Sequence, residues 1–381
     1  MINIVDKSNC TGCSACVQIC GKKAIRLVFD NEGHSYPNVD VEKCVNCGLC
    51  DTICPMQHKE IIPSDDNAKD PNVYAVYNKD SIVREKSTSG GIFTALAEQI
   101  IKEGGVVYAA RFDQNFHIYH DSFSYIEQID YYRGSKYAQS DLGEVFKRIR
   151  SDLKNKTVLF VGTPCQVAGL KLFLRKEHDN LYTCDFICMG ISSSKHWEDY
   201  LKEFWSGKSI NSIFFKDKRN GWHNWKMNIK YSGGEYLANG SEDPFFYGYV
   251  KRLTMRPSCR TCPFRTYKRI SDFTIADAWG IDKTHPEFDD NKGCSTLILQ
   301  SEKSEVIFEK IRSKLNVIAY SINDVIRYNP YIVTPITPHP AVDLFAKVYK
   351  EKGFLEAIKQ CKHSQQQSLI KRLLKKIREI I

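Results

Sequence analysis

The spacing of the cysteines near the N-terminus constrains this chain more than any other feature of its sequence. The pattern C-x2-C-x2-C-x3-C occurs twice, as Cys10, Cys13, Cys16 and Cys20 and again as Cys44, Cys47, Cys50 and Cys54. Eight of the fifteen cysteines therefore lie in this short segment. No apolar run long enough for a signal peptide precedes it, so the pattern predicts metal binding rather than disulfides.

This pattern is typical of proteins that hold two [4Fe–4S] clusters, in which the fourth cysteine of each motif binds the other cluster. We therefore expect one cluster on Cys10, Cys13, Cys16 and Cys54, and the other on Cys44, Cys47, Cys50 and Cys20. The alternative is a pair of zinc sites, but zinc usually takes two separated C-x2-C pairs. Proline follows the last cysteine of the second motif as Pro55 and is replaced by Gly21 in the first, a difference that removes no ligand.

The rest of the chain shows different sequence patterns. Residues 59–72 are polar and predict a linker between a module over 1–58 and a core over 73–340. In the core, β-rich runs alternate with amphipathic helical stripes, one over 92–101 behind a Ser89 cap and one over 142–153, which predicts a mixed α/β unit. The expected strands are Val73–Tyr77, Gly105–Ala110, Thr157–Val161, Tyr182–Ile187, Ser212–Phe215 and Phe273–Ala276.

The tail over 341–381 ends in a basic amphipathic helix, with apolar residues on one face and Lys and Arg on the other. Such a helix packs against its own domain or a partner subunit, or lies on an anionic membrane surface. No run of about 18 uncharged apolar residues occurs, so no membrane-spanning helix is expected. We expect a cytoplasmic protein.

Four short motifs follow one another in the core. They are Lys86-Ser87-Thr88-Ser89-Gly90-Gly91, Gly134-Ser135-Lys136-Tyr137, Gly162-Thr163-Pro164-Cys165-Gln166, and Arg256-Pro257-Ser258-Cys259-Arg260-Thr261-Cys262-Pro263 with Asp277-Ala278-Trp279-Gly280 after it. This ordered set resembles the beta subunits of coenzyme F420 hydrogenases and dehydrogenases, some of which are fused to a ferredoxin module. The resemblance covers the chain up to about residue 340, although the family's glycine before the acidic residue of the last motif stands here as Ala276.

The resemblance implies an α+β protein: a bacterial-type 2[4Fe–4S] ferredoxin domain followed by a mixed α/β core that binds FAD and one further [4Fe–4S] cluster. A Ser/Thr/Gly run at a helix N-terminus suits a pyrophosphate, or is a plain helix cap. On this basis we assign cofactor binding to Ser87, Thr88, Ser89, Gly90, Gly91 and Ser135, and both cofactor binding and catalysis to Lys136 and Tyr137, which otherwise belong to a surface loop.

The core cysteines would hold the third cluster. Cys259 and Cys262 form one C-x2-C pair and need two more ligands, for which we choose Cys165 and Cys188. Cys184 is the alternative to Cys188, but it lies mid-strand, where cysteines are usually core residues. Zinc and a redox disulfide are the other possibilities for this set. Cys165 follows a strand at a helix start, which predicts a lowered thiol pKa.

The net charge of +9 would suit a nucleic-acid partner, but clusters and a dinucleotide flavin are anionic and would nearly cancel it, so none is expected. Three functions stay open. The first and favoured one is a flavin-dependent oxidoreductase that acts on a small molecule with electrons from an external ferredoxin or a partner redox subunit. The others are an electron-input subunit that oxidises reduced coenzyme F420, and a non-enzymatic electron carrier.

Overall fold

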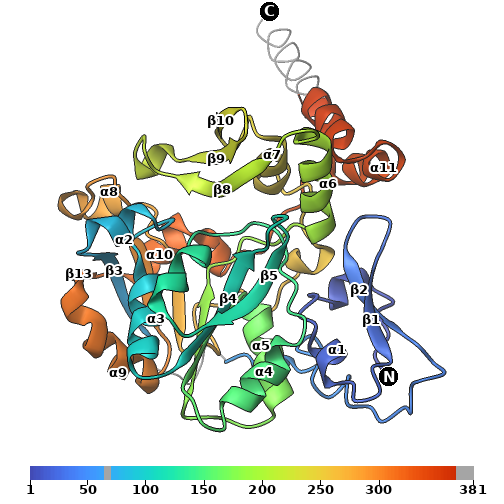
Figure 1. The fold of residues 1–381 in the computed structure, drawn as a ribbon, viewed down its shortest axis with the longest axis horizontal. Coiled ribbons are helices and arrows are strands. Elements are labelled where there is room, and N and C mark those ends of the chain that lie inside the picture. Colours follow the sequence, from blue (N-terminus) through green and yellow to red (C-terminus); the bar gives the residue numbers. More distant parts are fainter. Residues whose placement is uncertain (64–69, 366–381) are drawn as a thin grey trace, which may run out of the picture.

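The computed structural model describes residues 1–63 and 70–365, and its largest element is an eight-stranded sheet with the order β13-β3-β12-β11-β7-β6-β4-β5 (Figure 1). The central strands β11, β7, β6 and β4 are parallel to one another, and antiparallel strands flank them on both sides. The mixed α/β core is thus confirmed. The strand bounds are β3 (Asn72–Asn78), β4 (Val106–Phe112), β5 (Ile118–Phe123), β6 (Val158–Val161), β7 (Leu181–Phe186), β11 (Phe273–Asp277), β12 (Ser295–Leu299) and β13 (Leu315–Ala319).

Helices cover both faces of this sheet. On one face, α3 (Ile92–Lys102) and α9 (Glu302–Ile311) pack against side chains such as Leu159. On the other, α4 (Val145–Asp152) and α5 (Pro164–Leu174) pack against its neighbour Phe160. Adjacent residues of a strand point to opposite faces, so a continuous apolar run such as β6 is buried on both sides. Three short helices complete the core: α2 (Ser81–Glu85), α8 (Ile281–Thr284) and α10 (Ile322–Tyr328).

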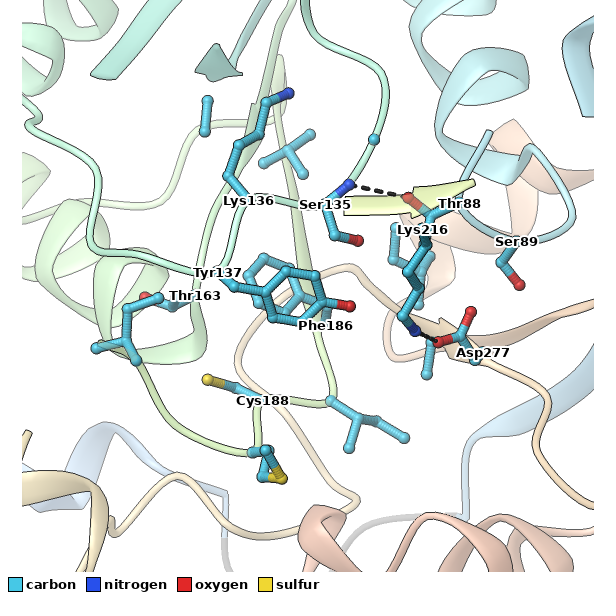
Figure 2. A pocket seen from close by; sticks show the side chains of 18 of the residues that line it. Thr88, Ser89, Ser135, Lys136, Tyr137, Thr163, Phe186, Cys188, Lys216 and Asp277 are labelled. Carbon is cyan, nitrogen blue, oxygen red and sulfur yellow. Dashed lines mark hydrogen bonds and ion pairs between the residues drawn. The ribbon is translucent and has the colours of Figure 1, made fainter. Parts of the chain in front are cut away.

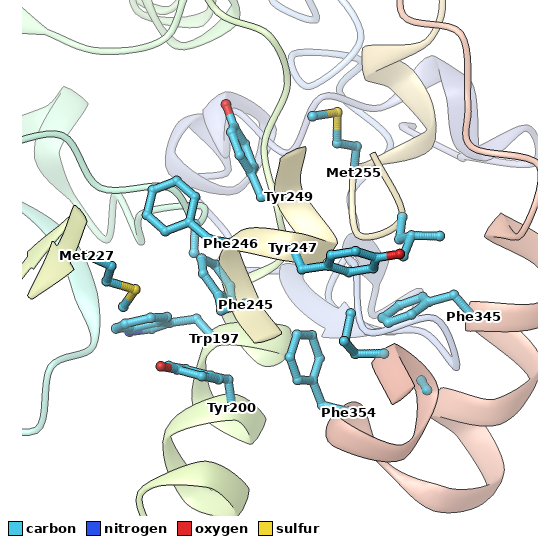
Figure 3. Packing of buried hydrophobic residues seen from close by; sticks show 14 of the residues in the cluster. Trp197, Tyr200, Met227, Phe245, Phe246, Tyr247, Tyr249, Met255, Phe345 and Phe354 are labelled. Carbon is cyan, nitrogen blue, oxygen red and sulfur yellow. The ribbon is translucent and has the colours of Figure 1, made fainter. Parts of the chain in front are cut away.

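A smaller sheet lies above one end of the core (Figure 1). It has the order β10-β9-β8, with β8 (Ile210–Asp217), β9 (Lys226–Tyr231) and β10 (Gly234–Ala238). An aromatic cluster packs it against α6 (Ser194–Phe204), α7 (Pro244–Val250) and α11 (Val342–Lys352) (Figure 3). Trp197 and Phe245 meet edge to face in this cluster, with ring centroids 4.8 Å apart, a favourable aromatic geometry.

The first part of the predicted tail belongs to this cluster. After α11, a helical segment over 354–365 buries Phe354, Ile358 and Cys361. The basic amphipathic stripe, and with it the expected membrane contact, lies outside the described residues. Among the helices that the structure describes, none is long and apolar enough to cross a membrane.

The N-terminal module docks directly on the core. It contains α1 (Ala15–Ile19) and the antiparallel pair β1 (Ile25–Phe29) and β2 (Ser35–Val39). Two groups of the module accept hydrogen bonds from the core: Gln18 Oε1 accepts from the buried Phe146 N–H at 2.8 Å, and the Gly12 carbonyl accepts from Gln139 Nε2 at 2.8 Å. The module and the core therefore form one packed assembly, with the module beside α4 and α5 (Figure 1).

Each of the expected strands and both helical stripes correspond to an element of the structure. One detail is wrong: Ser89 does not cap α3. The N-cap is Gly91, with φ of 85°, and the Ser89 hydroxyl instead donates to the Cys294 carbonyl at 2.6 Å. A positive φ is easily adopted by glycine, so the chain turns into the helix two residues later than the serine suggests.

Candidate functional site

Twelve cysteines, all with free thiols, make up the three predicted ligand sets. We call Cys10, Cys13, Cys16 and Cys54 the proximal set, Cys20, Cys44, Cys47 and Cys50 the distal set, and Cys165, Cys188, Cys259 and Cys262 the core set. Among the described residues, no group of three or more His, Cys, Asp or Glu side chains is arranged to hold a metal ion.

The proximal set brings together residues from both motifs. Burial raises the pKa of the Cys13 thiol to about 12, and the nearby thiols of Cys54 and Cys10 add to this shift. Burial also raises the pKa of Cys16, followed by the influence of Cys13, Cys10 and Cys54. The structure thus places Cys54 of the second motif beside three cysteines of the first, as the crossed ligand pattern of two-cluster ferredoxins requires.

The core set forms where parallel strands end. Cys165 follows β6 in the first turn of α5, Cys188 follows β7, and Cys259 and Cys262 come from the turn after Arg256. The pKa of Cys188 is raised to about 12, first by burial and then by the neighbouring thiols of Cys259 and Cys262. Cys184 lies apart: it is buried inside the sheet, and the pKa of its thiol is raised by burial and then by Asp185 and Asp272. The structure therefore groups Cys188, and not Cys184, with the other three.

The expected lowering of the Cys165 pKa is wrong. Burial raises the pKa of this thiol well above its ordinary value, and the neighbouring Cys262 raises it further. The position at the start of α5 is correct, with Thr163 as N-cap and Gln166 completing a capping box. Desolvation at this interface raises the thiol pKa by more than the N-terminus of the helix lowers it.

The three sets lie in series. Gly169 stands one turn after Cys165 on α5, and a Cβ atom on it would lie 3.0 Å from the Cys13 sulfur. Cys54, Cys165 and Cys262 pack around the same small apolar cluster, so the proximal set adjoins the core set. At the other end of the module Cys47 is exposed, so the distal set reaches the surface.

A cavity of about 510 Å³ adjoins the core set (Figure 2). It lies at the carboxyl ends of β6, β7 and β11, which is where parallel α/β sheets bind ligands. Its lining includes Cys165 and Cys188 together with the residues predicted for cofactor binding: Ser87, Thr88, Ser89, Gly91, Ser135, Lys136 and Tyr137. Gly90 supports this wall from behind, since a Cβ there would lie 2.4 Å from the Val76 carbonyl oxygen.

The loop over 87–91 is held in place from several sides. Thr88 Oγ1 accepts a hydrogen bond from the Ser135 N–H at 2.9 Å, which joins two of the predicted motifs. Lys218 Nζ donates to three main-chain carbonyls, including that of Ser89 at 2.9 Å. The N–H groups of the first turn of α3 begin directly after this loop, so the wall offers backbone donors to an anion.

Lys136 and Tyr137 occupy adjacent positions on the same wall. Burial lowers the pKa of Lys136 to about 7, and the positive charge of Arg111 lowers it further. Its ammonium donates to the carbonyls of Tyr132 and Arg133 at 2.9 and 3.0 Å. Tyr137 packs edge to face on Tyr249, with ring centroids 4.9 Å apart. A lysine that titrates near neutrality in a cavity is suited to bind an anion or to move a proton.

Sequence reasoning does not identify Lys216, and its pairing with Asp277 is seen only in the structure. Lys216 Nζ and Asp277 Oδ2 are 2.5 Å apart, and only 7% and 14% of the side chains are exposed (Figure 2). Burial alone would lower the pKa of Lys216, but the charge of Asp277 and the contact with Tyr137 together raise it above its ordinary value. The charge of Lys216 also lies 5.1 Å from the ring centre of Trp279. A period-two strand pattern places Lys216 on the opposite face of β8 from the buried Ile213 and Phe215, so neither its burial nor its partner on another strand could be read from the sequence.

His120 supplies an observation on whether a cofactor suits this cavity. Its Nε2 donates to the Val161 carbonyl at 2.9 Å, which leaves Nδ1 as an acceptor, and no described residue donates to it. Burial lowers the pKa of His120 to about 4, so the ring is neutral near pH 7. A buried acceptor in the wall of the cavity fits a ligand with N–H or O–H donors, and a flavin ring has an N–H of this kind.

Family models match both the core and the N-terminal module of this chain. Residues 73–147 and 155–324 match the N-terminal and C-terminal regions of the family described as coenzyme F420 hydrogenase/dehydrogenase, beta subunit, and residues 9–58 match a 4Fe-4S dicluster domain. No curated protein matches the chain. Among solved structures, a chain of the F420-reducing [NiFe] hydrogenase complex from Methanosarcina barkeri is 18% identical, with a TM-score of 0.48 over 80% of this chain and 94% of that one. This chain belongs to the coenzyme F420 hydrogenase/dehydrogenase beta-subunit family and carries a 4Fe-4S dicluster domain at its N-terminus.

Proposed function

We propose that this chain is an iron–sulfur flavoprotein oxidoreductase that relays electrons between its ferredoxin-type module and an FAD that reduces or oxidises a small molecule. The observation that carries the proposal is that one cavity is lined by the predicted cofactor residues and by two cysteines of the core set. A bound flavin exchanges two electrons with an organic molecule and single electrons with iron–sulfur centres.

The residues of this chain have distinct tasks in the proposal. The loop over 87–91 and the first turn of α3 would bind the pyrophosphate through backbone donors. The Lys136 ammonium would balance anionic charge, and Tyr137 and His120 would orient the ring, one by contact and the other by accepting a hydrogen bond. The proximal, distal and core sets would each hold one [4Fe–4S] cluster. The exposed Cys47 marks the face for an external ferredoxin or a partner redox subunit.

The flavin part of the proposal is tested by titrating FAD into anaerobically reconstituted, iron-loaded protein. We expect one FAD per chain and loss of its visible absorbance on addition of reduced ferredoxin. If the iron-loaded protein binds no flavin, the chain is a carrier without catalytic function and the proposal is wrong.

The family description favours a second candidate, an electron-input subunit that oxidises reduced coenzyme F420 for a larger complex. The same FAD-loaded protein distinguishes the two. Rapid reduction of the flavin by reduced F420, but not by reduced ferredoxin, would establish the second candidate in place of the first.

A further inference from the structure

Arg256 is completely buried at the junction between the N-terminal module and the core. Its guanidinium donates to the carbonyls of Cys10 and Ser35, each at 2.6 Å, and to Gln139 Oε1 at 3.2 Å. The same group reaches the sulfur of Cys10 at 3.4 Å and lies over the ring of Tyr36. Among the described residues its partners are therefore neutral groups and one cysteine sulfur, with no carboxylate.

A buried guanidinium without a carboxylate is costly, because its charge has left water and nothing opposite in sign replaces it. Arginine remains protonated in proteins, so it cannot escape this cost by losing its proton. A negative charge at the Cys10 sulfur would balance it. The proximal set provides such a charge when its four thiolates bind a cluster, because an all-cysteine [4Fe–4S] centre is anionic.

The distal set has different surroundings. Its sulfurs receive main-chain donors, with the Ile2 N–H 3.2 Å from Cys50 and the Ala24 N–H 3.3 Å from Cys20. Its member Cys47 is exposed, so water screens charges there. In the part of the chain that the structure describes, no Lys or Arg is hydrogen-bonded to a distal sulfur. The Met1 ammonium lies near Cys50 and Cys44, but it is 43% exposed and paired with Asp51 at 2.9 Å, so the charge close to the distal set is screened whereas Arg256 is buried.

Arg256 also contacts the core set, through its main chain. The Cys259 N–H donates to the Arg256 carbonyl at 3.0 Å, so the same residue bonds to the core set through its backbone and to the proximal set through its side chain. It thus stands where the two sets meet.

We propose that Arg256 is a positioning residue that raises the reduction potential of the centre held by the proximal set above that of the distal one. A fixed positive charge favours the reduced state, which carries one more negative charge, and burial strengthens this interaction. The inference rests on the proposed iron–sulfur function and adds to it an order of potentials within the module.

The test is a potentiometric titration followed by electron paramagnetic resonance on full-length, iron-loaded protein. For Arg256→Gln we expect the midpoint potential of one component of the resonance signal, that of the proximal centre, to fall. At the wild-type midpoint of this component, the ratio of reduced to oxidised centres should then fall about tenfold. Arg256→Lys keeps the positive charge but replaces the forked guanidinium by a single ammonium group, so we expect a smaller shift of the potential in the same direction. A Cys10→Ser variant identifies the component, because a changed ligand affects its own centre first.

Lys7→Gln is the matched control. Lys7 lies over Tyr36 like Arg256, with its Nζ 3.8 Å from the ring centre, but its side chain is 45% exposed. We expect little shift from removing this screened charge. The inference is overturned if a fully iron-loaded Arg256→Gln protein shows no shift, an equal shift in all components, or a shift confined to a component that Cys10→Ser leaves unchanged. An iron content too low for three clusters in the wild type would instead overturn the proposed function.

Discussion

Lys136 is the residue whose chemistry depends most on its surroundings, because burial brings its pKa to about 7. Below this pH the side chain is charged and attracts an anion, and above it a proton must be taken up before the ion pair forms. The affinity for FAD should therefore fall as pH rises from 7 to 9, by at most about tenfold per pH unit for one proton. Flavin fluorescence titrations measure it.

In this titration Lys136→Gln should bind FAD more weakly at pH 6 and show little pH dependence. Lys147→Gln, which removes an exposed lysine on α4, should behave like the wild type. An unchanged pH profile in Lys136→Gln would contradict the role that we give this ammonium.

The Lys216–Asp277 pair yields a prediction on stability. Asp277→Asn leaves a buried ammonium without its partner, and such a change typically costs about 3–5 kcal/mol. Glu144→Gln breaks the Lys147–Glu144 pair, whose side chains are 39% and 68% exposed, and should cost less than about 1 kcal/mol. Thermal unfolding of the iron-loaded variants compares the two, and equal loss in both would show that the buried pair is not structurally important.

At the scale of elements, the loop between α2 and α3 depends on Gly90. A Cβ there would lie 2.4 Å from the Val76 carbonyl oxygen and 2.8 Å from the Ser295 nitrogen. Both are backbone atoms, which cannot move away by a side-chain rotation. Gly90→Ala should therefore push the loop away from β3, destabilise the protein by about 1–3 kcal/mol and weaken FAD binding.

The control for this substitution is Gly21→Ala, since nothing lies within 4 Å of the added Cβ there. It should leave both the unfolding temperature and FAD binding nearly unchanged. If Gly90→Ala binds FAD as tightly as Gly21→Ala does, the loop is not part of the cofactor site.

The elements that could be predicted are those whose signal is local. The apolar run of β6 and the amphipathic stripe of α3 can each be recognised in the local sequence, and both appear in the structure. The strand β5 reads Ile-Tyr-His-Asp-Ser-Phe and shows no clear pattern, because His120 faces the cavity rather than the core. The pKa of Cys165 was mispredicted for a related reason: burial by a distant part of the chain is invisible in the local sequence.

At the scale of the molecule, Gly169 lies at one of the close contacts between the module and the core, and a single substitution can open this contact. Val in place of Gly169 would force its side chain against the Cys13 sulfur and Ala15. Gly169→Val should keep its iron but exchange electrons between core and module more slowly, as seen by rapid mixing with reduced ferredoxin. Lys171→Val places the same β-branched residue on α5 away from this contact, and it should exchange at the wild-type rate. Equal rates in both variants would contradict the docked arrangement.

The grouping of cysteines into three sets underlies every step from the cavity to the surface, and iron analysis tests it most directly. Anaerobically reconstituted wild-type protein should contain about twelve iron atoms per chain, four for each cluster. Cys188→Ala should contain about eight, because the core set loses a ligand, and Cys184→Ala should keep about twelve, because that cysteine lies apart in the sheet. A wild-type count near eight, or loss of iron in Cys184→Ala and not in Cys188→Ala, would contradict the account.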